Sequence, residues 1–144
     1  CPDDPPSAGE SDDDNLSGAA GNDFLFADGG FNVIIGGPGN DRTSADGPTL
    51  FDLGGGEDKA LGSAGSDELD GGAGRDDLDA EGGADCVVGG SGRDELEGRE
   101  GNDKLIARDG TRDRVDGGSG PDRGRFDGAD RVSAVADREL RGGC

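Results

Sequence analysis

The sequence predicts an all-β fold, a parallel β-solenoid in which two nine-residue repeats form each coil. Two observations predict it: a nonapeptide that recurs in register along most of the chain, and a composition too poor in apolar residues for an ordinary globular core. Of the 144 residues, 32 are glycine and 28% are hydrophobic, and the formal net charge is −20. A chain of this kind orders only if something outside it supplies the stabilisation that its core lacks.

The first segment, residues 1–8, holds three of the six prolines and is expected to be an extended leader without strand pairing. The repeat begins at Gly9. Its clearest copy is Gly71–Asp79, "GGAGRDDLD", which fits the nonapeptide G-G-x-G-x-D-x-U-x, where U is a large apolar residue. Residues 89–97, "GGSGRDELE", fit it equally well.

Consecutive blocks of this length fill residues 9–133. There are fourteen blocks, and eleven of them have nine residues. Two blocks are one residue short, which we place at Thr43 and Gly124, and one is a residue longer near Ala107. The fourth position is nearly always glycine, the sixth is Asp in twelve blocks of fourteen, and the eighth is mostly large and apolar. Three columns in one register indicate a true repeat rather than a biased composition.

Each block has a turn half and a strand half. Glycine in the turn allows positive φ and close approach of the backbone to an ion. Side chains alternate across the strand, so the eighth-position residue should point inward, while the seventh and ninth point outward. Two blocks then form one flattened coil, and roughly seven coils stack at the strand spacing of about 4.8 Å.

The sixth-position carboxylates repel one another from coil to coil, and a thin apolar core does not offset the entropy of ordering so much glycine. Calcium resolves both difficulties, because it accepts carboxylate and carbonyl oxygens, takes about 6–8 ligands and tolerates irregular geometry. Magnesium prefers a stricter octahedron and fits less well. Without calcium we expect the other interpretation of this composition, a solvated disordered acidic tract, to hold.

On these motifs, residues 9–133 resemble the RTX (haemolysin-type) calcium-binding β-roll family. The resemblance implies a right-handed parallel β-roll with calcium between same-edge turns of successive coils, held by Asp side chains and turn carbonyls. It assigns the sixth-position residues to two ladders. The complete ladder is Asp23, Asp41, Asp58, Asp76, Asp94, Asp113 and Asp130. The interrupted ladder is Asp14, Asn32, Thr49, Asp67, Asp85, Asp103 and Asp122.

The ladders bound the number of ions. Seven turns per edge leave six gaps on each, so twelve Ca²⁺ is the ceiling, and ten would cancel the net charge of −20. We expect roughly eight to eleven sites from the spacing and the ligands. The vacancies should lie on the interrupted ladder near Asn32 and Thr49, which supply no carboxylate.

The last segment, residues 134–144 ("AVADRELRGGC"), lacks the glycine turn and is expected to form a short helical or irregular cap, as terminal repeats of solenoids often do.

The three cysteines, Cys1, Cys86 and Cys144, leave three interpretations open. Cys1 of one chain could bond Cys144 or Cys86 of a neighbour and link rods end to end. Two cysteines could instead close a bridge within the chain. Alternatively, Cys1 could be the lipidated first residue of a bacterial surface lipoprotein.

The composition also excludes functions. There is no histidine, which removes imidazole catalysis, and the carboxylates follow a metal-binding spacing, so we expect no enzyme. The acidic surface disfavours nucleic acid, and no apolar run is long enough to cross a bilayer. If the chain is exported, its signal peptide is expected to have been removed already.

These exclusions leave an extracellular, calcium-dependent structural protein that assembles with copies of itself into a fibre or a bacterial surface structure. The alternative is a calcium-dependent folding and secretion module of a larger secreted enzyme or toxin.

Overall fold

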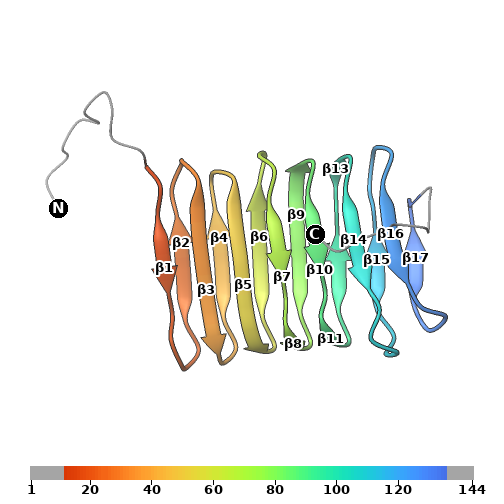
Figure 1. Cartoon of the computed structure of the whole chain (residues 1–144), viewed down its shortest axis with the longest axis horizontal. Helices are drawn as coiled ribbons and strands as arrows, with labels where there is room; N and C mark the ends of the chain where they lie inside the picture. Colours follow the sequence, from red (N-terminus) through yellow and green to blue (C-terminus); the bar gives the residue numbers. More distant parts are fainter. Residues whose placement is uncertain (1–11, 136–144) are drawn as a thin grey trace, which may run out of the picture.

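The computed structural model describes residues 12–135 as two stacked parallel sheets with the coils following one another in sequence order (Figure 1). The predicted leader, residues 1–8, and all but the first two residues of the predicted cap lie outside the described residues. All strand pairing in this range is parallel, and the described residues contain no helix. The predicted all-β parallel solenoid is therefore confirmed.

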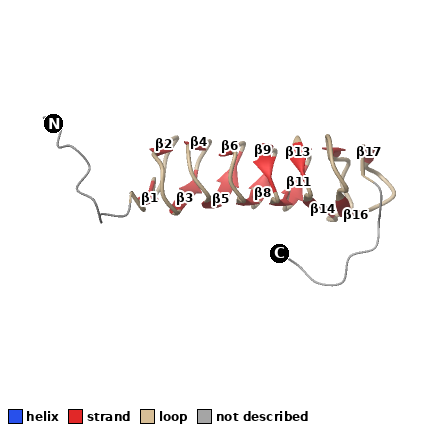
Figure 2. Ribbon diagram, turned by 90° about the horizontal axis from the view of Figure 1, so that it is seen from above, coloured by secondary structure: helices blue, strands red, loops and turns tan. Residues whose placement is uncertain are grey.

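The two sheets take alternate strands of the chain, so each coil contributes one strand to each layer (Figure 2). The nine-stranded sheet runs in the order β1 (Asn15–Ser17), β3 (Asn32–Pro38), β5 (Thr49–Gly56), β7 (Glu68–Asp70), β10 (Cys86–Val88), β14 (Lys104–Ala107) and β16 (Arg123–Phe126), with β8 (Ala73–Gly74) and β11 (Ser91–Gly92) beside it. The eight-stranded sheet runs in the order β17 (Arg131–Ser133), β15 (Arg114–Asp116), β12 (Glu95–Glu97), β9 (Asp77–Gly83), β6 (Lys59–Ser63), β4 (Arg42–Ala45) and β2 (Phe24–Ala27), with β13 (Glu100–Gly101) beside it.

The register places equivalent repeat positions side by side. Ile34 pairs with Phe51, which pairs with Leu69, and the same column continues along the nine-stranded sheet. Leu78 pairs with Leu96 in the other sheet. These eighth-position side chains form the core, as the alternation predicts. The fully buried ones are Ile34, Phe51, Leu69, Leu78, Val87, Leu96, Leu105 and Val115.

Departures from the apolar column are compensated by neighbours. Gly124 occupies an eighth position, and a Cβ built on it would lie 1.8 Å from Cζ of Phe126. The ring of Phe126, two residues on and facing the same side, therefore fills the space that a larger residue would take. Ala60 is also small, and it shares the core cluster with the larger Phe51 and Leu53.

The irregular block lengths are absorbed in the turns. The strands around Thr43 and Gly124 pair without interruption, so the sequence-based placement of the two deletions at these residues is wrong. Residues paired on successive coils are 18 positions apart up to Ala27 and Ala45, but 17 apart where the pair spans turn 46–48, as Asn32 and Thr49 do, so one residue is missing from that turn. Pairs that span turn 127–129, such as Arg114 and Arg131, are again 17 apart, which places the second missing residue in that turn. The extra residue lies in turn 108–112, close to the predicted position near Ala107. Turns accept such changes because a shift within a strand would turn core side chains outward.

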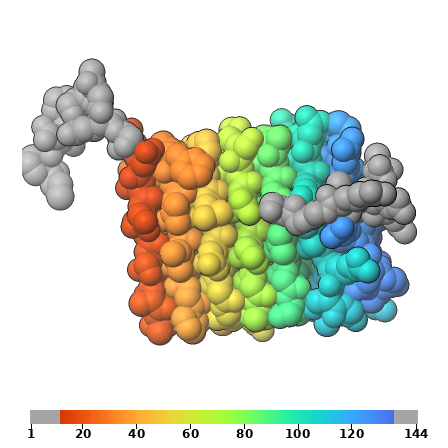
Figure 3. Space-filling model, in the orientation of Figure 1, coloured from red at the N-terminus to blue at the C-terminus, as the bar shows by residue number. Residues whose placement is uncertain are grey.

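The described coils form a flat-sided rod rather than a rounded globule (Figure 3). Its two broad faces are the outer sides of the sheets, and its two narrow edges are the glycine turns. The fourteen principal strands begin at a sixth-position residue or directly after it. The complete ladder follows one edge, leading into the eight-stranded sheet, and the interrupted ladder follows the other.

Candidate calcium ladders

The sixth-position residues of each edge are stacked by a repeated hydrogen bond. The backbone N–H of one ladder residue donates to Oδ1 of the ladder residue one coil further on. In the complete ladder these N···O distances are 2.8 Å for Asp23 to Asp41, 2.7 Å for Asp41 to Asp58, 2.9 Å for Asp58 to Asp76, 3.0 Å for Asp76 to Asp94, 2.8 Å for Asp94 to Asp113 and 3.1 Å for Asp113 to Asp130. Every step is made, so the structure brings all seven predicted residues of this edge together.

The second carboxylate oxygen of most ladder residues has no hydrogen-bond partner among residues 12–135. The buried Oδ2 atoms without a hydrogen bond are those of Asp23, Asp41, Asp58, Asp76, Asp85, Asp94, Asp103 and Asp122. A buried carboxylate oxygen without a donor carries a large desolvation penalty. Eight such oxygens at the same repeat position indicate that the fold leaves them for a cation.

Main-chain carbonyl oxygens converge on the same points. A Cβ built on Gly71 would lie 2.7 Å from Oδ2 of Asp76 and 2.7 Å from the carbonyl oxygen of Gly89 on the next coil. The turn at Gly98 repeats this arrangement with Asp103 and Gly117, at the same two distances. Because glycine has no Cβ, the space next to both the carboxylate oxygen and the carbonyl oxygen stays empty in these turns. An all-oxygen donor set of this kind suits calcium.

No group of three or more His, Cys, Asp or Glu side chains is gathered for a metal within residues 12–135. The reason lies in the repeat: each turn brings one sixth-position carboxylate, and the next follows one coil away. The remaining oxygens must come from the main chain. A polar cavity of about 370 Å³ runs along the complete ladder, and Asp41, Asp58 and Asp76 all line it.

Burial raises the pKa of ladder carboxyls. Desolvation is the main cause for Asp76 and Asp85, whose pKa rises to about 7, and for Asp94, whose pKa rises to about 6. Neighbouring ladder carboxylates add to the shift, and the backbone hydrogen bond from the preceding coil opposes it. These values describe the protein without bound cations, where each like charge along the ladder disfavours ionisation.

The interrupted ladder differs over its first turns, where the protein itself satisfies the polar groups. Asn32 Oδ1 accepts from the N–H of Asp14 at 3.0 Å, and its Nδ2 donates to the carbonyl of Asp28 at 2.8 Å. The Thr49 hydroxyl donates to the carbonyl of Gly47 at 2.7 Å. The Asn32 amide and the Thr49 hydroxyl therefore act as hydrogen-bond donors at positions where most other turns present an Asp carboxylate oxygen.

Asp67 extends this behaviour by one turn, which sequence reasoning missed. Its Oδ1 accepts from the N–H of Thr49 at 2.6 Å, as in the rest of the ladder. Its Oδ2, however, accepts from both the N–H and the hydroxyl of Ser63, at 2.7 and 3.1 Å. The signal was present in the sequence, since Ser63 stands at a second position where the clearest copies carry glycine.

From Asp67 onward the interrupted ladder resembles the complete one. The N–H groups of Asp67, Asp85 and Asp103 donate to the next carboxylate at 2.8, 3.0 and 2.9 Å. Two of the four terminal ladder residues differ: Asp14 Oδ2 accepts from the N–H of Asp28, and Asp130 Oδ2 accepts from the N–H of Asp127.

A family model of the RTX calcium-binding nonapeptide repeat, with four copies, matches residues 8–45, 52–85 and 88–123, about three quarters of the chain. The chain belongs to this RTX repeat family. The resemblance drawn from the nonapeptide is thereby confirmed, and the ladder geometry is that of a calcium-binding β-roll. A search of the curated proteins finds no match.

The remaining predicted positions are only partly covered. Cys86 begins β10 and is half-buried, whereas Cys1 and Cys144 lie outside the described residues, so the predicted cysteine pairing stays a prediction. Within the described part of the chain, no helix is long and apolar enough to cross a membrane.

Proposed function

We propose that this RTX β-roll is an extracellular structural protein that folds on Ca²⁺ and is stabilised by ladders of the ion along both edges. The observation that carries the proposal is the set of eight buried Asp oxygens without a protein partner. Unfilled, they oppose folding through desolvation and mutual repulsion. Filled by calcium, they become the ligands that hold successive turns together, so that folding and metal binding are one event.

The distribution of these oxygens supports a count at the lower end of the eight to eleven ions expected from the sequence. The complete ladder carries five of the eight, and the interrupted ladder carries three, all at or beyond Asp85. The turns at Asn32, Thr49 and Asp67 are satisfied by hydrogen bonds, which supports vacancies at that end of the interrupted ladder.

The test is circular dichroism with isothermal titration calorimetry on the whole chain. Calcium should induce the β signal from a largely unfolded state, and a chelator should abolish it. Magnesium at the same concentration should be much less effective, because it prefers a strict octahedron and keeps its waters. A β signal that survives complete removal of calcium above pH 7, where the ladder carboxyls are ionised, would overturn the proposal.

We further propose that the rod assembles end to end with copies of itself. Among the described residues, β1 and β2 end the two sheets on one side, and β16 and β17 end them on the other. Edge strands present unpaired backbone groups that another chain can pair with. Near the first end, Phe24 is 77% exposed and Phe26 50% exposed, which adds apolar surface close to the open edges.

Sedimentation and electron microscopy in calcium separate this assembly from the alternative, a folding module of a larger secreted enzyme or toxin. Filaments or a ladder of oligomers support assembly, and gels run without reductant show whether Cys1, Cys86 or Cys144 link the copies. A single monomeric species at high concentration contradicts assembly and leaves calcium-dependent folding intact.

A further inference from the structure

Five arginines gather on the complete-ladder side of the rod, toward its C-terminal end, in a chain whose net charge is −20. They line one shallow cavity of about 120 Å³ together with three acidic residues, Asp94, Glu95 and Asp113. The arginine row, as this set is called below, consists of Arg75, Arg93, Arg112, Arg114 and Arg131. Cations held this close together against their mutual repulsion need an explanation.

The row follows the coil spacing of the fold. Arg75, Arg93 and Arg112 each stand immediately before a residue of the complete ladder, at the fifth position of successive turns. The ladder hydrogen bonds from Asp76 to Asp94 and from Asp94 to Asp113 stack these turns directly. The three guanidinium groups are therefore anchored about one strand spacing, roughly 4.8 Å, apart. Arg114 and Arg131 pair in register on the adjoining strands.

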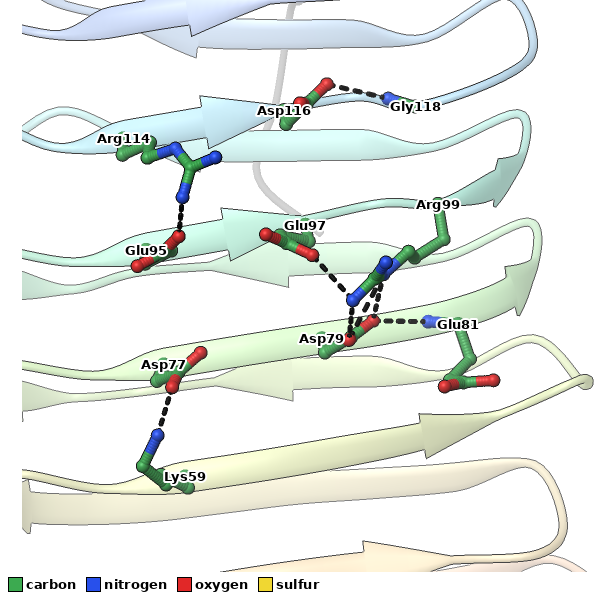
Figure 4. A network of polar contacts seen from close by, with 10 residues as sticks. All are labelled: Lys59, Asp77, Asp79, Glu81, Glu95, Glu97, Arg99, Arg114, Asp116 and Gly118. Carbon is green, nitrogen blue, oxygen red and sulfur yellow. Dashed lines mark hydrogen bonds and ion pairs between the residues drawn. The ribbon is translucent and has the colours of Figure 1, made fainter.

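Most of the row has no partner in the described part of the chain. Arg114 pairs with Glu95 on the next coil (Figure 4). Arg75, Arg93, Arg112 and Arg131 are all exposed, and their side chains make no hydrogen bond or ion pair with any residue in 12–135. Two other cations of the rod are used differently, since Lys59 pairs with Asp77 and Arg99 with Asp79 and Glu97 (Figure 4).

The first coils use the same fifth position in another way. The N–H of Asn40 donates to Asn22 Oδ1 at 2.9 Å, and that of Glu57 donates to Asn40 Oδ1 at 3.0 Å. There the position serves the fold itself. At Arg75, Arg93 and Arg112 the same position carries an exposed positive charge instead.

We propose that the arginine row binds a linear acidic polysaccharide, and that it does so in the calcium-loaded roll. Guanidinium groups form paired, charge-assisted hydrogen bonds with carboxylate and sulfate oxygens. A polymer with one charge per sugar repeats on a length comparable to one coil. An extended acidic peptide repeats its same-face side chains at roughly 6.6 Å, which does not match the row. No aromatic residue lines the cavity, so single-stranded nucleic acid would find no stacking platform.

The dependence on calcium follows from the acidic residues in the cavity and rests on the proposed function. Asp94 and Asp113 belong to the complete ladder, and calcium bound there would neutralise them. Glu95 is already paired with Arg114. The five arginines exceed the three acidic residues of the cavity by two charges without calcium, and by four once Asp94 and Asp113 are neutralised. Calcium that folds these turns would therefore also raise the positive charge of the row.

The test measures binding of dextran sulfate, short oligogalacturonate, neutral dextran and single-stranded oligo(dT) to the full chain in calcium. The variant Arg75→Gln/Arg93→Gln/Arg112→Gln should weaken binding of the acidic polysaccharides by about tenfold or more. It should also lower the slope of log affinity against log salt by roughly one per arginine. A matched control, Arg42→Gln/Lys104→Gln/Arg123→Gln, makes the same change in net charge elsewhere and should shift affinity much less.

The two proposals fail separately. Circular dichroism of each sample reports calcium-dependent folding, so a folded wild-type roll that binds neither acidic polysaccharide contradicts only the arginine row. Equal weakening by both triple variants would show that binding depends only on net charge. Tighter binding of oligo(dT) than of the acidic polysaccharides would show that the partner is a nucleic acid. Either result overturns the proposal. If the variant Arg75→Gln/Arg93→Gln/Arg112→Gln does not fold, the single variant Arg93→Gln replaces it, and a smaller loss of affinity is expected.

Discussion

The two edges of the rod are built from the same nonapeptide, yet they satisfy their buried polar groups differently. The complete ladder leaves a carboxylate oxygen open at five consecutive turns, from Asp23 to Asp94. The interrupted ladder closes its turns at Asn32, Thr49 and Asp67 with protein donors and opens only from Asp85 onward. The comparison indicates that protein donors close some turns, whereas the remaining turns leave an oxygen that a cation would have to satisfy.

Removing calcium should expose this difference most strongly. A chelator should unfold most of the rod, because the open oxygens then repel one another. Hydrogen exchange followed by mass spectrometry should find the last protected amides in β3 and β5, which begin at the turns closed by hydrogen bonds. The strands β9 and β12, which follow open turns, should exchange first. Uniform loss of protection along the chain would mean that the closed turns add no independent stability.

A first-position glycine should be nearly as important as the carboxylate that it faces. In Gly71→Ala the new methyl group would lie 2.7 Å from Asp76 Oδ2, at the point the two oxygens share. We expect the substitution to destabilise the calcium-loaded roll by about 1–3 kcal/mol, as overpacking usually does, and to raise the calcium concentration at the folding midpoint. The matched control is Gly82→Ala, whose methyl group would meet nothing closer than 3.6 Å. Equal effects of the two substitutions would contradict a role for this point in metal binding.

The raised pKa of ladder carboxyls gives the metal-free chain a pH dependence of definite sign. Burial raises the pKa of Asp76 and Asp85 from 3.8 to about 7, and that of Asp94 to about 6. The folded form without calcium therefore holds protons more tightly than the unfolded chain. Its stability should increase as pH falls from about 7 toward 4 and be lost again as pH rises through the same range. Circular dichroism in chelator should show β signal appearing on acidification.

Calcium reverses this trend, since it binds the ionised carboxylates. In calcium, the affinity should fall as pH decreases through 7 and 6, because protons compete for the same oxygens. Loss of metal-free β signal on acidification, or a calcium affinity that does not change between pH 8 and pH 6, would contradict these assignments.

Much of this architecture could be predicted from sequence because the repeat imposes one environment on every copy of a position. The Asp and apolar columns defined the strands, the core and both ladders, down to the weak positions Asn32 and Thr49. The positions of single-residue deletions were predicted less well, because moving a deletion by a few residues leaves the Asp and apolar columns unchanged. The strand register places the first deletion in turn 46–48.

What the repeat could not reveal are side-chain contacts between its columns. Asp67 reads as an ordinary ladder residue, and only the contact from Ser63 shows that its second oxygen is occupied. The same holds for Gly124, where the ring of Phe126 fills the space of the missing side chain. The two residues belong to different positions of the nonapeptide, so the repeat pattern alone does not connect them. The nonapeptide does not specify its fifth position, so it predicts nothing about the arginines there. Their proximity becomes evident only when the coils are stacked in the structure.

Restoring carboxylates to the interrupted ladder should convert closed turns into open ones. Asn32→Asp/Thr49→Asp removes the donors to the carbonyls of Asp28 and Gly47 and places acidic oxygens there instead. We expect calorimetry to find about one or two additional calcium ions per chain, and the folded state to depend more steeply on calcium. Asp14 and Asp67 stand on either side of the new carboxylates, but their Oδ2 atoms already accept hydrogen bonds from Asp28 and Ser63, so the added ions would depend on the introduced carboxylates and the turn carbonyls. An unchanged stoichiometry would show that hydrogen bonding in these turns is not what keeps calcium out.

The smallest effect is expected from the ion pairs on the outer face of the eight-stranded sheet (Figure 4). Lys59 and Asp77 pair across one coil, but their side chains are 57% and 47% exposed. An exposed pair contributes only about 0.2–1 kcal/mol and is screened by salt, so Lys59→Gln should shift the thermal midpoint of the calcium-loaded roll slightly, and less still in high salt. A double-mutant cycle with Asp77→Asn isolates the pair itself. A coupling comparable to the effect of Gly71→Ala would mean that surface charge, rather than the turns, holds successive coils together.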